Sequence, residues 1–154
     1  MNIRNSAKAI IIIDDKVLLT KNMDDEGYFY LFPGGGQEFG ETIHQALIRE
    51  CIEEIGDLVE IGELLHIREY IGKNHEHSSF DMYVHQVEYY FVCNLKNGLS
   101  SFKVPTNPDS HQVGVEWVQI KDLLEYRIYP KELRKYIIKY VQNEKYPVYL
   151  GDIN

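Results

Sequence analysis

The segment from Gly35 to Gly56 reads GGQEFGETIHQALIRECIEEIG and is the most informative part of the chain. From Thr42 to Ile55 its apolar residues recur with the 3.6-residue period of an α-helix. Gly56 follows the last of them directly, at the place where a glycine in the left-handed conformation commonly ends a helix. The segment therefore predicts a glycine-rich loop followed by one amphipathic helix.

Three glutamates of the predicted helix lie on one side of it. At about 100° per residue, Glu50, Glu53 and Glu54 fall within an arc of roughly 100°. Arg49 stands four residues before Glu53, which is the spacing of a helical ion pair. The adjoining arc is apolar and predicts the face that packs on the core, with Leu47, Ile48, Cys51, Ile52 and Ile55.

The acidic arc has two interpretations. Like charges on adjoining turns destabilise a helix, and a hard divalent cation offsets that repulsion. Because Mg²⁺ takes carboxylate oxygens together with water and substrate phosphates, the arc predicts a Mg²⁺ or Mn²⁺ site. The glycines at Gly34–Gly36 let backbone approach a ligand closely, and Glu41 stands where the helix dipole favours an acid. A solvent-facing acidic stripe is the alternative.

The rest of the chain alternates strand and helix patterns. Pro33–Gly36 predicts an end to regular structure, and Gly62 predicts a bulge in the strand that follows the helix. The predicted strands are 7–13 and 17–20, paired as a hairpin, then 28–32, 58–71, 84–95 and 113–118, with a loop at 96–112. A short helical segment at 121–126 and an amphipathic helix at 131–142 complete a single domain, residues 1–154, of mixed α/β sandwich type.

The composition argues against several classes of protein. Lys and Arg number 16 and Asp and Glu number 24, which gives a net charge of −8. A diffuse basic surface for DNA or RNA and a polybasic membrane patch are therefore not expected. No apolar run approaches the ~20 residues of a membrane span, and the first residues lack the pattern of a secretion signal. The two cysteines, Cys51 and Cys93, predict buried thiols in a cytoplasmic setting.

The charged and glycine positions of the segment form a long pattern with fixed gaps. It resembles the signature of the Nudix hydrolase family, which is also called MutT-like: G-x5-E-x7-R-E-U-x-E-E-x-G-U, where U is a bulky aliphatic residue. Every charged and glycine position matches from Gly35 onward. Two U positions differ. Cys51 is still a small residue of buried type, whereas Asp57 puts the packing after the helix in doubt, which Leu58 and Val59 would have to restore.

The resemblance implies an α/β/α sandwich with a mixed β-sheet, and residues 31–34 and 116–123 extend it beyond the signature. It also implies an enzyme that uses Mg²⁺ or Mn²⁺ to hydrolyse the pyrophosphate bond of a nucleoside diphosphate linked to another group. Arg49 and Glu41 would hold the site in place. The metal ligands that the resemblance implies are the Gly34 carbonyl, Glu50, Glu53 and Glu54.

The general base stays open between two sets of acids. In the family it is either a signature glutamate, here Glu50 or Glu53, or an acid on a later loop. The later candidates are Glu76, Asp81, Asp109 and Glu116. For each of these, a solvated surface position is the simpler interpretation.

The sequence does not identify the substrate. ADP-ribose pyrophosphatases tend to place a proline after the signature, but Gly72 and Lys73 stand there, and the coenzyme A pyrophosphatase pattern is not met. A nucleoside triphosphate, a nucleotide sugar and a capped or triphosphorylated RNA 5′ end stay open, whereas other nucleic acids and membranes are not expected as partners. The alternative to an enzyme is a non-catalytic Nudix nucleotide sensor. A homodimer is also left open.

Overall fold

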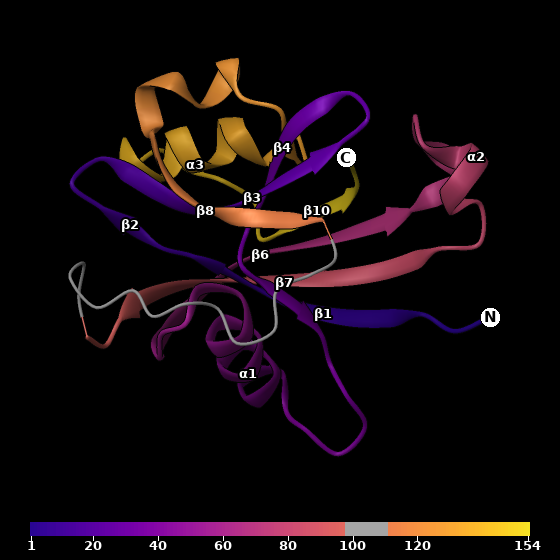
Figure 1. Ribbon diagram of the computed structural model, residues 1–154, viewed down its shortest axis with the longest axis horizontal. Coiled ribbons are helices and arrows are strands. Elements are labelled where there is room, and N and C mark those ends of the chain that lie inside the picture. Colours follow the sequence, from indigo (N-terminus) through magenta and orange to yellow (C-terminus); the bar gives the residue numbers. More distant parts are fainter. Residues whose placement is uncertain (98–110) are drawn as a thin grey trace.

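The computed structural model describes residues 1–97 and 111–154 of the chain. Two β-sheets lie between helix α1 (Ile43–Ile55) and helix α3 (Leu133–Val141), which flank them on opposite sides (Figure 1). Each helix packs on its own hydrophobic cluster of strand residues. The expected α/β/α sandwich is confirmed.

The first sheet carries the glycine-rich segment at its edge. Its strands are β1 Arg4–Ile10, β5 Gly34–Gly36, β6 Val59–Ile71, β7 His85–Leu95 and β10 Tyr149–Asp152. They are arranged in the order β10-β6-β7-β1-β5. Strand β1 runs parallel to β7 and antiparallel to β5, and β10 runs parallel to β6. This sheet is therefore mixed, as expected.

The second sheet is built around one long strand. Its strands are β2 Ile12–Ile13, β3 Lys16–Asp24, β4 Gly27–Leu31, β8 Gln112–Gln119 and β9 Ile128–Tyr129. Strand β3 pairs antiparallel with β2, β4 and β8, and β9 adds parallel to β4. The predicted strands at 28–32 and 113–118 are confirmed as β4 and β8.

Short helical segments connect the longer elements. The segments η1 (Gly72–Asn74) and α2 (Ser78–Asp81) lie between β6 and β7, and the 3₁₀-helix η2 (Ile120–Glu125) follows β8. The predicted helical regions 121–126 and 131–142 correspond to η2 and α3. Within the part of the chain that the structure describes, no helix has the length and apolar character needed to cross a membrane.

The expected hairpin of residues 7–13 with 17–20 is only partly right. Ile12–Ile13 pairs with β3 across a turn in which Asp14 and Asp15 have positive φ angles of 50° and 60°. Residues before Ile11 instead belong to β1, which pairs with β7 and β5. The sequence does not reveal this change of sheet, because strands buried on both faces form one continuous apolar run.

The expected end of regular structure at Pro33–Gly36 is wrong. Residues 34–36 form β5 and pair with β1, with Gly35 opposite Ala7. The short C-terminal strand β10 has no counterpart among the predicted strands. Residues 98–110 of the predicted 96–112 loop lie outside the described residues, and Gln112 already belongs to β8.

The predicted core face of α1 is confirmed except at one position. Leu47, Cys51 and Ile55 are fully buried, but Ile52 is 36% exposed. The bulge predicted at Gly62 is confirmed by register shifts of β6 between Ile61 and His66.

After α1, Val59 is buried and restores the packing that the signature departure puts in doubt, whereas Leu58 is exposed. Asp57 is buried as well, and its Oδ1 accepts hydrogen bonds from the Leu58 N–H at 2.7 Å and the Asn97 amide at 2.8 Å.

Candidate active site

The two ends of α1 are fixed by local hydrogen bonds. The Thr42 hydroxyl accepts the Gln45 N–H at 3.1 Å, and the Gln45 side chain accepts the Thr42 N–H at 2.8 Å, which together form a capping box. At the other end Gly56 has a φ of 69° and ends the helix in the left-handed conformation. These ends set the register of the helix and hence the side to which its glutamates point.

Strand β5 lies directly against the glutamates of α1. The Glu54 carboxylate is buried, and its Oε1 accepts the backbone N–H of Gly34 at 2.9 Å. A Cβ atom at Gly35 would lie 2.5 Å from Oε1 of Glu50. The glycines therefore allow the strand to approach the carboxylates more closely than any other residue could.

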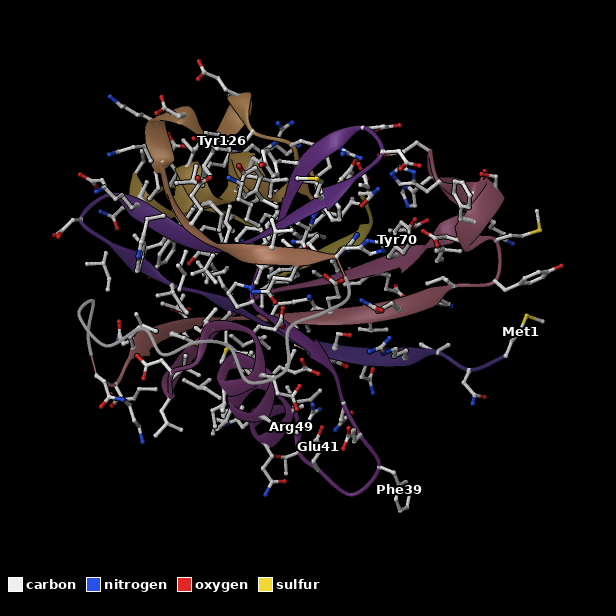
Figure 2. All side chains as sticks on the ribbon, in the orientation of Figure 1. Met1, Phe39, Glu41, Arg49, Tyr70 and Tyr126 are labelled. Carbon is white, nitrogen blue, oxygen red and sulfur yellow. The ribbon has the colours of Figure 1, made fainter. Side chains whose placement is uncertain are left out.

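Arg49 connects the acidic residues of the segment. Its guanidinium donates to both oxygens of Glu41 at 2.7 and 3.2 Å, to Glu50 at 3.0 Å and to the Gly36 carbonyl at 2.9 Å. Figure 2 shows Glu41 and Arg49 side by side next to α1. The predicted Arg49–Glu53 ion pair is present at 3.5 Å. Arg49 and Glu41 thus hold the positions of Glu50 and the end of β5.

The carboxyl groups differ in their electrostatic surroundings. Hydrogen bonds from Arg49 and from the Glu38 backbone lower the pKa of the Glu41 carboxyl. Burial raises the pKa of the Glu50 carboxyl, and Arg49 offsets only part of that effect. Burial therefore disfavours the negative charge of Glu50, and an added cation would stabilise it.

The oxygen atoms around β5 suit a hard divalent cation in kind, because Mg²⁺ and Mn²⁺ prefer carboxylate and carbonyl oxygens. Among residues 1–97 and 111–154, however, no three His, Cys, Asp or Glu side chains are arranged so that they could hold a metal ion. Glu50 and Glu53 face Arg49, and the Gly34 carbonyl accepts a hydrogen bond from Lys8 at 3.2 Å. The metal site therefore stays a prediction, which requires these side chains to turn.

Of the later acids proposed as alternative bases, the three within the described residues have partners outside the contact between β5 and α1. Glu76 is exposed and pairs with Lys131 at 3.2 Å. Asp81 accepts a hydrogen bond from the Tyr70 hydroxyl at 2.8 Å. Glu116 lies opposite Leu19, which packs in the cluster on the α3 side. Asp109 lies outside the described residues.

A cavity of about 660 Å³ opens between the β3–β4 hairpin and the segment that joins β6 to β7. Leu31, at the end of β4, lines it three residues before Gly34. Its walls combine rings, two arginines and several acids: Asp24, Asp25, Glu26, Phe29, Leu31, Arg68, Tyr70, His77, Phe80, Asp81, His111, Arg127, Tyr129 and Asn154. Four aromatic side chains from separate elements thus meet in one place, and Figure 2 labels one of them, Tyr70.

The two arginines of the cavity are held by carboxylates. Arg127 makes a bidentate ion pair with Asp24 at 2.8 and 2.9 Å and lies over the rings of Phe29 and Tyr129 at 5.3 and 5.5 Å. Arg68 makes a buried bidentate pair with Glu88, at 3.0 Å for both bonds. A planar aromatic ligand with polar edges fits walls of this kind.

Two residues that contact the site, Lys8 and Gln112, are not among those predicted from the sequence. Lys8 donates to the Gly34 carbonyl, and the Gln112 side chain donates to the Glu54 carbonyl at 2.9 Å. In a strand, neighbouring side chains point to opposite faces, and this alternation in β1 is a signal that could have set Lys8 apart from the alanines beside it. Ala7 and Ala9 pack on the α1 side, so a lysine between them faces the other way.

Comparison with known proteins gives the same family as the signature. A model of the NUDIX domain matches residues 3–140. An RNA pyrophosphohydrolase of Helicobacter pylori is 33% identical, with 93% of this chain and 96% of its own length covered. A putative nudix hydrolase of Caenorhabditis elegans is also 33% identical over 79% of this chain, which spans only 30% of the length of that protein.

Among solved structures, a NUDIX hydrolase from Nitrosomonas europaea superposes with a TM-score of 0.73 at 23% identity, and the match covers 96% of this chain and 94% of that one. This likeness supports the fold. Since the domain match extends far beyond the signature and includes most of the strands described above, the chain belongs to the Nudix hydrolase family.

Proposed function

We propose that the protein is a divalent-metal-dependent pyrophosphohydrolase that acts on a nucleoside 5′-polyphosphate. The observation that carries this proposal is the contact between β5 and α1, in which Arg49 and the Gly34 N–H hold Glu50 and Glu54 beside a glycine backbone. Oxygen donors in such a group, next to backbone that leaves room for a ligand, are suited to a metal-bound diphosphate.

In the proposed reaction, water attacks a phosphorus atom of the anhydride. A bond forms between the water oxygen and phosphorus, the bond to the bridging oxygen breaks, and the bridging oxygen leaves with the departing phosphate. Glu50, Glu53, Glu54 and the Gly34 carbonyl would hold the divalent cation. When bound, the cation neutralises phosphate charge and lowers the pKa of a coordinated water. Glu50 or Glu53 would take the proton from the attacking water, and Arg49 would orient both carboxylates.

The cavity would hold the nucleoside. Phe29, Tyr70, Phe80 and Tyr129 offer ring faces for stacking against a base. The acids at the rim, Asp24 among them, would accept hydrogen bonds from amino groups of a base. Since Leu31 lines the cavity and β5 begins three residues later, a nucleoside here would direct its phosphates toward α1.

Among the substrates left open by the sequence, we favour a triphosphorylated RNA 5′ end. The support is that relatives named RNA pyrophosphohydrolase are matched over nearly their whole length. The net charge of −8 argues for recognition of the terminal nucleotides only, because contacts along an RNA backbone require basic surface.

A panel of substrates tests the proposal. Phosphate and pyrophosphate release would be measured from a 5′-triphosphorylated RNA oligonucleotide, nucleoside triphosphates, a nucleotide sugar and ADP-ribose, each with Mg²⁺, with Mn²⁺ and with EDTA. We expect turnover only with metal and the highest kcat/KM on the RNA. Faster turnover of a free nucleotide would overturn the RNA assignment. Metal-dependent binding of nucleotides without turnover of any substrate would instead support the non-catalytic sensor.

A further inference from the structure

Lys8 reaches the candidate active site from the first sheet. It is half-buried on β1, opposite Gly34 of β5 in the strand register. Its Nζ donates to the Gly34 carbonyl at 3.2 Å and to the Phe32 carbonyl at 3.4 Å. Gly34 is also the residue whose N–H binds Glu54. The ammonium group therefore lies beside the same backbone unit that contacts the signature glutamates.

The positive charge of Lys8 is not neutralised by a direct ion pair within the described residues, because its hydrogen bonds go to backbone carbonyls alone. Three arginines of the site and the cavity differ in this respect. Arg49 pairs with Glu41 and Glu50, Arg68 with Glu88, and Arg127 with Asp24. A half-buried ammonium group that makes no direct ion pair is only partly compensated by the carboxylates of Glu50 and Glu88 further away, and an anionic ligand would bind it directly.

Lys8 also lies between the two parts of the proposed substrate site, because β1 runs between β5 and β7 and places Lys8 opposite Gly34 on one side and Tyr90 on the other. Its charge acts on Glu50, a signature acid of α1, and on Glu88 of β7. Glu88 in turn binds Arg68, which lines the cavity. A group in this position can meet a phosphate that extends from the cavity toward the glutamates.

The hydrogen bond from Lys8 to the Gly34 carbonyl also affects how a divalent cation can bind. The signature resemblance assigns this oxygen to a divalent cation, yet here it accepts from an ammonium group. Two cations at one carbonyl repel each other. Lys8 therefore opposes cation binding until an anion arrives that can accept its hydrogen bonds.

We propose that Lys8 is a substrate-phosphate-binding residue that exchanges the Gly34 carbonyl for a phosphate oxygen of the substrate. The inference rests on the proposed function, since it concerns the same substrate site. This exchange makes metal and substrate bind cooperatively, because a phosphate that accepts the hydrogen bonds of Lys8 leaves the Gly34 carbonyl available to the metal.

The test uses binding measurements on the whole protein rather than turnover. Calorimetry would give the Mn²⁺ affinity of the protein alone, and the affinity of a methylene-bridged, non-hydrolysable nucleoside triphosphate analogue with Mn²⁺ present. The variants are Lys8→Met, Lys8→Arg and, as a control with the same loss of charge, Lys145→Met. Lys145 is exposed and far along the chain, after α3.

For Lys8→Met we expect changes of opposite sign. The affinity for the analogue falls about 10- to 100-fold, as for loss of a charge-assisted hydrogen bond. The affinity for Mn²⁺ alone is at least that of wild type, and it is roughly threefold higher where solvent screens the Lys8 charge poorly. Lys8→Arg keeps most of the analogue affinity, and Lys145→Met changes neither value.

Two results would overturn the inference. If Lys8→Met binds the analogue within twofold of wild type, Lys8 does not contact the phosphate. If it weakens Mn²⁺ and analogue together, Lys8 only supports the backbone of residues 32–34. Should Lys8→Met not fold, as judged by circular dichroism, Lys8→Gln replaces it with the same expectations. Failure of the wild type to bind the analogue would instead refute the proposed function itself.

Discussion

Glu54 of α1 and Gly34 of β5 are joined by a hydrogen bond of 2.9 Å from the Gly34 N–H to the Glu54 carboxylate. The Glu54 carboxylate is only slightly exposed, and the backbone carbonyl of the same residue accepts from Gln112 of β8. One glutamate thus connects α1 to an edge strand of the first sheet and to a strand of the second. The carboxylates of the candidate site are therefore placed by contacts with both sheets.

Replacement of Glu53 or Glu54 by glutamine tests the assignment of the signature acids. Glutamine keeps the size of the side chain and an oxygen that can accept the Gly34 N–H, but it removes the negative charge. We expect kcat to fall about 10²-fold or more with Mg²⁺, while the melting temperature changes little. Glu60→Gln, at an exposed position of β6, is the matched control. Wild-type turnover in Glu53→Gln and Glu54→Gln would show that these acids are not ligands.

Substitution of Gly35 tests whether the close approach of β5 matters for catalysis. A Cβ at this position would meet the end of the Glu50 side chain at 2.5 Å, and since that side chain is flexible, it would be displaced rather than the fold disrupted. We expect Gly35→Ala to lower kcat about 10²-fold, as small misplacements do. Gly114→Ala, where a Cβ meets open space, serves as the control. Equal activity of both variants would contradict the role of Gly35.

Arg49 is expected to act by orienting carboxylates, and replacement by lysine tests this. A lysine keeps the charge, but it cannot bind Glu41 through two bonds and still reach Glu50 and the Gly36 carbonyl. We expect kcat/KM to fall about 10- to 100-fold with little change in urea denaturation. Arg134→Lys, at an arginine whose hydrogen bonds within the described part of the chain all go to backbone carbonyls, should leave both unchanged. Activity of Arg49→Lys within twofold of wild type would exclude the orienting role.

The parts of the site that depend on near neighbours could be predicted from the sequence. The helix from Thr42 to Ile55, the glycine that ends it and the Arg49–Glu53 pair each involve residues within about one turn. These features can therefore be predicted from the periodicity and spacing of neighbouring residues alone. The helical periodicity of the apolar residues also identified most of the buried face of α1 correctly. It was wrong for Ile52, which lies at the margin of the apolar arc.

Contacts between distant segments could not be predicted in this way. The run before Ile11 is apolar whichever strand it pairs with, so its place beside β7 depends on tertiary structure alone. The cavity gathers Phe29, Tyr70 and Tyr129 from three strands, and in a chain with 12 tyrosines nothing local marks the ones that meet. Lys8 likewise reaches the Gly34 carbonyl only because β5 pairs with β1 in the folded chain.

The buried His66 should make folding stability depend on pH. Its Nδ1 donates to the Pro147 carbonyl at 2.8 Å, its Nε2 has no hydrogen-bond partner among residues 1–97 and 111–154, and the rings of Tyr136 and Tyr146 pack on it. Burial lowers the pKa of the His66 imidazole below its ordinary value of 6.5. The unfolded chain therefore binds this proton more readily, so the contribution of His66 is complete above pH 6.5 and is lost as the pH falls from there toward the folded-state pKa.

We therefore expect the free energy of unfolding in urea to decrease between about pH 7.5 and about pH 5, and to decrease less in His66→Gln, which has no group to protonate at that site. His44→Gln, at an exposed histidine of α1, should keep the full wild-type decrease. If His66→Gln loses as much stability over this range as wild type does, protonation of the buried imidazole is not what weakens the fold. The paired carboxyl of Glu88 would not explain such a loss either, because its pKa falls from 4.5 to about 2 on folding, so its contribution is lost only below this pH range.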